Sequence, residues 1–190
     1  MSWQLPASLE IGGAFYAIRT DFRVILDIFM AFNDPDLPDY AKPQVMIEIL
    51  YEDWKNIPPE HMEEAVKEAY RFIDCGNEPD NKKRPKMVDW EQDSDIIVPA
   101  VNKVAGIGDI RSLPYLHWWT FMGYFMEIGE GVFSSVLNIR YKQAHGKKLE
   151  KWEKDFYREN RRIIDFKRRL SEEEQEALEK EKQILKELFG

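Results

Sequence analysis

The first eighty residues alternate between apolar stretches and short polar breaks, and this pattern predicts a β-hairpin near the N-terminus. Residues 9–11 and 15–18 are mostly apolar or aromatic and flank Gly12 and Gly13. Glycine tolerates the positive φ of a tight hairpin turn, so we expect two short antiparallel strands here. Two strands alone are only marginally stable, and we therefore expect a helix to cover one of their faces.

Three helices are predicted after the hairpin, because apolar residues recur at spacings that place them on one helical face. The first helix is capped by Asp21 and ends near Asn33, and the second covers roughly residues 43–54. The third begins near Met62 and stops at Gly76, a residue type that often ends helices.

The middle of the chain combines a polar loop, a capped helix and a strongly aromatic segment. Residues 77–92 are polar and aperiodic and predict a mobile loop, and Asp93 caps the helix that follows. Residues 113–128 form the aromatic segment, in which Pro114 suits the first position of a helix. Apolar side chains fall on every face of this segment, which is typical of a helix buried on all sides or of a membrane span. The segment is too short for a membrane span, which needs about 20 apolar residues. We therefore expect a central helix buried on all sides, followed by a short helix near Val132.

The last third of the chain predicts two charged amphipathic helices. A heptad pattern runs from Leu149 to Leu170 through Phe166, and a capping box at Ser171 starts the second helix. The first helix is basic, with 10 basic and 5 acidic residues over 147–169, and the second is acidic, with 3 and 7 over 171–190. Opposite charges favour antiparallel packing of the two helices, or pairing between subunits. The positions expected to form a protein interface are Leu149, Trp152, Phe156, Ile163, Leu178, Leu185 and Leu188.

These elements predict a mainly α fold: a multi-helix domain with a small N-terminal β-hairpin and a C-terminal charged helical hairpin. Residues 1–145 form the helical core domain, which includes the hairpin and the loop 77–92. Residues 146–190 form the C-terminal amphipathic helices, which either belong to the same domain or serve as an oligomerisation appendage. The heptad stripe could fold back onto the core or pair with a second subunit, so we expect a homo-oligomer without fixing its number.

The composition narrows the class of protein. The 190 residues carry 27 basic and 35 acidic side chains, a net charge of −8, and the excess of acid lies in residues 1–80. An acidic surface repels phosphate groups, so nucleic acid is not an expected partner. Cys75 is the only cysteine, which excludes an intrachain disulfide and a zinc site built from several cysteines. No signal peptide or membrane segment is recognisable, so we expect a cytoplasmic protein without a membrane partner.

Few residues suggest chemistry, and each fits a structural role better than a catalytic one. His61 and Glu64 are three residues apart on a predicted helix, but no third metal ligand lies near them in the sequence. His117 could act as a general base, although a hydrogen-bonded core histidine is far more common. Cys75 lies at a helix C-terminus, where the helix dipole raises the thiol pKa. We therefore expect no enzyme, no catalytic residues, no cofactor and no metal.

Several segments together resemble a family of small bacteriophage proteins, the Gp-fifteen-type family of siphophages and prophages. The most specific segment is Leu116-His-Trp-Trp-Thr-Phe. The others are individually weak, but their order and spacing cover most of the chain: residues 5–6, 18–23, 72–76, 93–97, 139–141 and 156–158.

This resemblance implies a product of the phage tail module that acts as a tail assembly chaperone in the cytoplasm of the infected host. The implied partners are the tape measure protein, which the chaperone would coat, and the tail-tube protein, whose subunits it would help to recruit. The family defines no catalytic residues, so none carry over. A structural tail component, such as a completion or connector protein, is the alternative.

Overall fold

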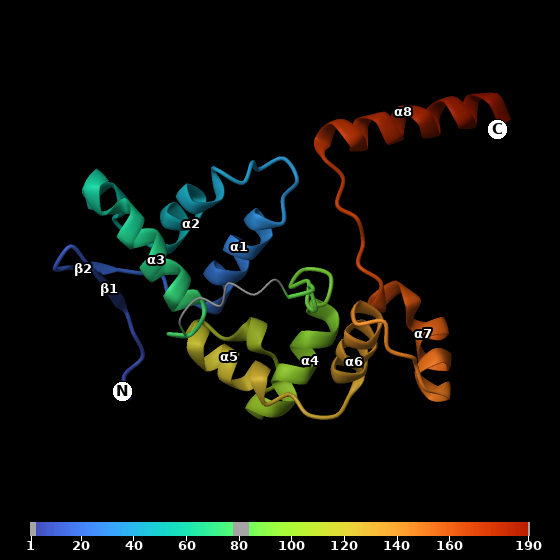
Figure 1. The fold of residues 1–190 in the computed structure, drawn as a ribbon, viewed down its shortest axis with the longest axis horizontal. Helices are drawn as coiled ribbons and strands as arrows, with labels where there is room; N and C mark the ends of the chain where they lie inside the picture. Colours follow the sequence, from blue (N-terminus) through green and yellow to red (C-terminus); the bar gives the residue numbers. More distant parts are fainter. Residues whose placement is uncertain (1–2, 78–83, 190) are drawn as a thin grey trace.

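The computed structural model describes residues 3–77 and 84–189, and it is mainly α-helical with one small sheet (Figure 1). The mainly α fold with an N-terminal β-hairpin is therefore confirmed. Three short 3-10 helices, at 54–56, 59–61 and 110–112, connect the longer elements. These longer elements are β1 (Ser8–Ile11), β2 (Ala14–Ala17), α1 (Phe22–Phe32), α2 (Lys42–Leu50), α3 (Met62–Ile73), α4 (Ser94–Ala105), α5 (Trp118–Met126), α6 (Val132–Ala144), α7 (Lys151–Ile164) and α8 (Glu172–Phe189).

The β-hairpin turns at Gly12 and Gly13, as predicted, and is held against α3. Both glycines have positive φ, and β1 and β2 pair in an antiparallel register that places Leu9 opposite Tyr16. A Cβ atom at Gly12 would lie only 2.6 Å from the Nε2 of His61, so a side chain at this position would displace the histidine ring. The Gly12 N–H also donates to the Glu64 carboxylate at 2.9 Å. The covering helix expected for the hairpin is therefore α3.

The main core lies between α1, α2, α3, α4 and α5. It is built from aliphatic residues and a cluster of stacked aromatic rings, in which Phe22 of α1 lies 4.8 Å from Phe121 of α5. The Trp118 ring lies 5.6 Å from the same Phe121 ring. Offset stacking of this kind adds to the stability gained from burying apolar area.

The aromatic helix differs from its prediction in both its start and its exposure. The helix α5 begins at Trp118 instead of Pro114, because His117 is extended and forms an isolated β-bridge with Asp21, just before α1. In this pairing the Trp118 N–H donates to the Thr20 carbonyl at 2.7 Å, and the Phe22 N–H donates to Leu116. The helix is also not buried on all sides, since Met126 is 76% exposed.

His117 caps the N-terminus of α5. Its Nδ1 accepts the Trp119 N–H at 3.0 Å, and its Nε2 lies 3.0 Å from the Pro6 carbonyl. Because Nδ1 is the acceptor, the proton of the neutral ring is on Nε2 and is donated to Pro6. The histidine thus joins α5 to the N-terminal segment.

Arg19 explains the early end of α2, which we predicted to reach Trp54. Its guanidinium donates to the carbonyls of Ile49 at 2.8 Å and Tyr51 at 2.7 Å, and so binds the negative end of the helix. The chain leaves α2 at Leu50, and Trp54 lies in a separate 3-10 helix.

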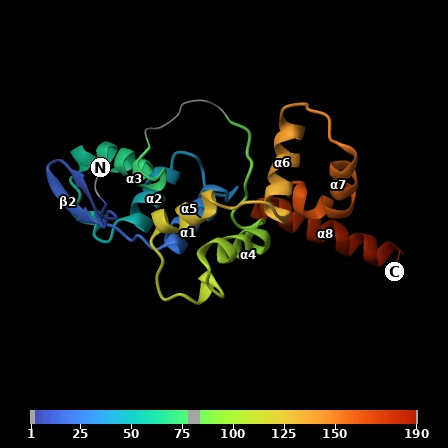
Figure 2. The same cartoon turned by 90° about the horizontal axis from the view of Figure 1, so that it is seen from below.

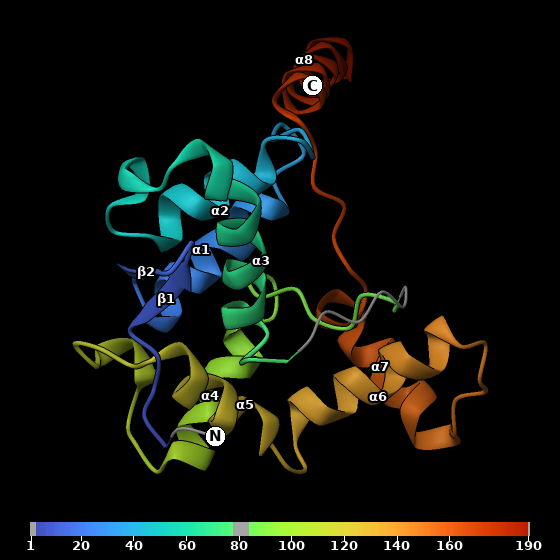
Figure 3. The same cartoon turned by 60° about the vertical axis from the view of Figure 1, so that its left-hand side comes forward.

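The C-terminal helices are present, and of the two arrangements expected for them, antiparallel packing against each other within the chain is not the one observed. The helix α7 packs against α6 instead, around Val136, Ile139 and Ile164, and Figure 2 shows this pair at the end of the molecule opposite the β-hairpin. Because α7 ends at Ile164, Phe166 and Leu170 lie beyond it in an extended strap, residues 165–171. The strap leads to α8, which stands apart from α6 and α7 (Figures 1 and 3).

Replacing His117 with alanine removes the cap of α5 and the bond to Pro6. We expect the free energy of unfolding to fall by about 1 kcal/mol or slightly more, the usual cost of losing an N-cap. Urea unfolding followed by tryptophan fluorescence measures this change. The matched control is His145→Ala, since His145 is exposed and its replacement should change stability by less than about 0.5 kcal/mol. Equal stabilities of the two variants would contradict the capping role.

Candidate protein-interaction surface

The two tryptophans of the aromatic segment tie α5 to the end of α3. The Trp118 indole N–H donates to the Ile73 carbonyl and the Trp119 indole N–H to the Phe72 carbonyl, both at 2.8 Å. These carbonyls lie in the last turn of α3, where they have no partner inside the helix. The most specific segment of the family resemblance is therefore a structural brace, because its histidine caps one helix and its tryptophans cap another.

The residues that suggested chemistry also occupy structural positions. His117 is buried and uses both ring nitrogens in the contacts described above. Burial, together with the nearby Asp74 charge, raises the pKa of the Cys75 thiol to about 11, so the reactive thiolate is disfavoured. His61 lies 3.8 Å from Glu64, and within residues 3–77 and 84–189 no group of three or more His, Cys, Asp or Glu could hold a metal ion.

Arg140 and Asp93 form a buried ion pair that the sequence did not reveal. The Nη1 atom of Arg140 donates to one Asp93 carboxylate oxygen at 2.6 Å, and Nη2 donates to the other at 2.8 Å. The remaining N–H groups donate to the carbonyls of Met87 at 2.9 Å, Ile163 at 2.8 Å and Ile164 at 2.7 Å. The guanidinium thereby uses its full set of five donors and joins α4, α6, the loop before α4 and the end of α7.

Asp89 extends this network to the strap. Burial alone would raise the pKa of its carboxyl. The pKa is instead lowered to about 2, because the carboxylate accepts hydrogen bonds from the Lys86 side chain and the Gln92 backbone N–H and lies near the charges of Lys86 and Arg169. Arg169 of the strap lies 3.1 Å from Asp89 and 2.7 Å from Glu91. The side chain of Gln92 also bonds the Asp165 carbonyl and the Lys167 N–H, each at 2.9 Å. The strap is thus fixed to the loop that precedes α4.

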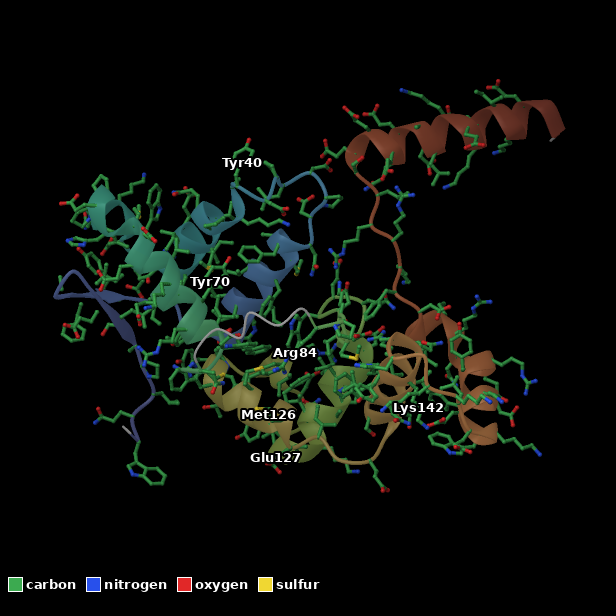
Figure 4. The ribbon with its side chains drawn as sticks, in the orientation of Figure 1. Tyr40, Tyr70, Arg84, Met126, Glu127 and Lys142 are labelled. Carbon is green, nitrogen blue, oxygen red and sulfur yellow. The ribbon has the colours of Figure 1, made fainter. Side chains whose placement is uncertain are left out.

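A second buried carboxylate joins α6 and α7. Glu153 accepts the Lys142 ammonium at 2.6 Å, the Asn138 amide at 2.6 Å and the Glu150 N–H at 2.7 Å. The Lys142 hydrogen bond is the main cause that lowers the pKa of Glu153. Figure 4 shows Lys142 where α6 and α7 meet. This contact fixes the start of α7 against α6.

An apolar groove opens between the outer face of α4 and the segment that joins α5 to α6. It has a volume of about 500 Å³, and carboxylates of Asp95, Glu127 and Glu130 stand at its rim together with Lys103. Met126 and Glu127 lie at the C-terminal end of α5, where the segment that joins α5 to α6 begins (Figure 4). The apolar side chains that line this groove are Ile96, Pro99, Ala100, Val104, Ile128, Val132 and Phe133.

Two other hollows are more polar than the apolar groove. One, of about 880 Å³, lies between the end of α1 and the strap and is lined by charged residues of both signs. The other, of about 660 Å³, follows the exposed side of α3, where Glu60, Glu63 and Glu64 accompany Val66 and Tyr70. Ligand and peptide sites are usually lined by apolar side chains with a few polar groups, which favours the apolar groove as the candidate interaction surface.

The residues predicted for a protein interface fall into three groups. Leu149, Phe156 and Ile163 pack against the core between α6 and α7, so this part of the heptad stripe folds back onto its own chain. Trp152 and Leu178 are exposed. Leu185 and Leu188 belong to α8, but their side chains lie outside what the structure describes. The sequence did not indicate the apolar groove, whose lining comes from two separate segments.

The comparisons with known proteins agree with the sequence resemblance. A family model described as Bacteriophage Gp15 protein matches residues 1–166. The chain belongs to this family. The match covers the helical core, the brace and α7, and it ends inside the strap, before α8. No curated protein and no solved structure matches the chain. Membership of the Gp15 family points to a structural or morphogenetic phage protein. Among the described residues, none of the helices combines the length and the apolar character that a membrane span requires.

Replacing Arg140 with methionine leaves the Asp93 carboxylate buried without its counter-charge. We expect the free energy of unfolding to fall by about 3–5 kcal/mol, as for other broken buried ion pairs. Replacing both residues, as Arg140→Met with Asp93→Leu, should recover part of the loss because no unpaired charge remains. Urea unfolding measures the three stabilities.

The matched control for Arg140 is Arg162→Met, which removes an exposed guanidinium from α7. Its effect should stay within about 0.5 kcal/mol. An Arg140→Met loss as small as that of the control would show that the buried pair does not hold these segments together.

Proposed function

We propose that this protein is a non-enzymatic tail assembly chaperone, which binds the phage tape measure protein and assists assembly of the tail tube in the host cytoplasm. Membership of a bacteriophage family supports a role in particle formation. The observation that carries the more specific proposal is the apolar groove beside α4. A chaperone needs such a surface to shelter apolar segments of its client, and it needs no catalytic residues.

The dimensions and charge of the groove favour an amphipathic helix as its occupant. Helices bind grooves of this kind by inserting apolar side chains at i, i+3, i+4 and i+7. Val132 in the lining is 50% exposed, so a bound helix can remove apolar surface from water here. Carboxylates of Asp95, Glu127 and Glu130 at the rim favour a client helix with Lys or Arg beside its apolar face.

The structural tail component is the rival function, and the composition of finished virions separates the two. A chaperone leaves before the particle is complete, so mass spectrometry of purified virions should find the tape measure protein and not this chain. Copies of this chain in stoichiometric amounts would support the structural component instead.

Val132→Asp tests the groove without harming the helix that bears it. Val132 is the first residue of α6, where a carboxylate interacts favourably with the helix dipole. The same change places a charge in the apolar groove and adds to the acidic rim. We expect co-expression with the parent chain to raise the soluble amount of tape measure protein several-fold, and the Val132→Asp variant to lose most of that gain.

The matched control is Phe15→Asp, which adds the same charge at an exposed aromatic residue of the β-hairpin. This control should retain the solubilising effect of the parent chain. Equal retention by both variants would place the client elsewhere, and a tape measure protein that gains no solubility from the parent chain would contradict the chaperone function.

A further inference from the structure

The helix α8 is fixed at its first turn and extends away from the rest of the chain. The Glu172 N–H donates to the Asp36 carboxylate at 2.9 Å, and Arg168 pairs with Glu174. Beyond this turn the helix runs outward (Figures 1 and 3), with Leu178 and Ile184 exposed. An amphipathic helix in this situation has an apolar side available to a partner.

The strap directs α8 away from the α6–α7 pair of its own chain. Asp165 accepts the Tyr157 hydroxyl at 3.0 Å at the start of the strap, and Arg169 pairs with Asp89 and Glu91 further along. The Lys167 N–H is bound by Gln92 between these two points. Folding α8 back onto its own α7 would require the chain to leave these contacts or the Glu172–Asp36 contact at the first turn of α8. A second copy of the chain can reach α7 without breaking them.

The turn between α6 and α7 carries the basic and aromatic surface that an acidic helix would need. We call residues 145–152 the hairpin tip; its exposed side chains include Lys147, Lys148, Lys151 and Trp152, and Trp152 is 55% exposed. Lys147 lies 4.6 Å from the ring of Tyr141, which is also exposed. Figure 2 shows this tip pointing away from α8 of the same chain.

We propose that α8 of one copy docks on the hairpin tip of a second copy, and that the exchange is reciprocal within a dimer. Residues 172–189 carry seven glutamates and three lysines, so α8 is acidic where the tip is basic. Leu178 and Ile184 then pack against Trp152, the kind of large aromatic anchor that dominates interface energies. The apolar groove beside α4 does not fit α8, because its rim is itself acidic. This inference is independent of the client and of the chaperone function.

A charge-exchange experiment on the full chain tests the dimer. The tip variant is Lys147→Glu with Lys148→Glu and Lys151→Glu, and the helix variant is Glu176→Lys with Glu179→Lys and Glu181→Lys; all six residues are exposed. Each variant alone brings like charges together at both contacts. Mixed in equal amounts they form a heterodimer in which both contacts again join opposite charges. Light scattering during gel filtration measures the mass of the particles.

The parent chain should have twice the 22.6 kDa mass of one copy, and each variant alone should dissociate at least about tenfold more readily, which corresponds to 1.4 kcal/mol. The mixture should regain the double mass and lose it as salt screens the charges. A control with Lys55→Glu and Lys67→Glu changes charge away from the tip and should behave as the parent. A monomeric parent, variants that associate like the parent, or a mixture that stays monomeric would each overturn the proposal.

Discussion

The buried pairing of Arg140 with Asp93 is the constraint on which the C-terminal half of the structure depends. A guanidinium removed from water is costly unless each of its donors finds an acceptor, and here the acceptors come from the loop before α4, the N-cap of α4 and the end of α7. All five donors of Arg140 are satisfied at once because these segments lie together in this arrangement. The same arrangement places Asp89 and Gln92 against the strap, which sets the direction in which α8 leaves the body. The buried Arg140 is thus linked, through the loop before α4 and the strap, to the position of α8 on the surface.

The N-terminal half is organised by a different device, the brace formed by His117, Trp118 and Trp119. These side chains satisfy backbone groups at the ends of α3 and α5 and hold the N-terminal segment. The residues that look most suggestive of chemistry are therefore committed to the fold. The apolar groove beside α4, the hairpin tip and α8 remain accessible to other proteins. This distribution suits a protein that acts by binding other chains.

The sequence predicted those parts of the fold that depend on local pattern. It did not predict the features that are determined by contacts between segments distant in the sequence. The hairpin at Gly12 and Gly13 and the cap at Asp21 follow from the preferences of single residues. The predicted start of α5 was wrong because His117 forms a β-bridge with Asp21, a residue far away in the sequence. The Arg140–Asp93 pair joins positions 47 apart, and no spacing rule connects them. The apolar groove likewise needs two segments that only the fold brings together.

Hydrogen–deuterium exchange of the full chain, with and without its tape measure protein, tests the central claim most directly. If the apolar groove shelters a client helix, amides of residues 94–104 and 126–133 should exchange more slowly in the complex, while those of the β-hairpin should keep their rates. Protection confined to other regions, or no change in a complex that demonstrably forms, would contradict the account.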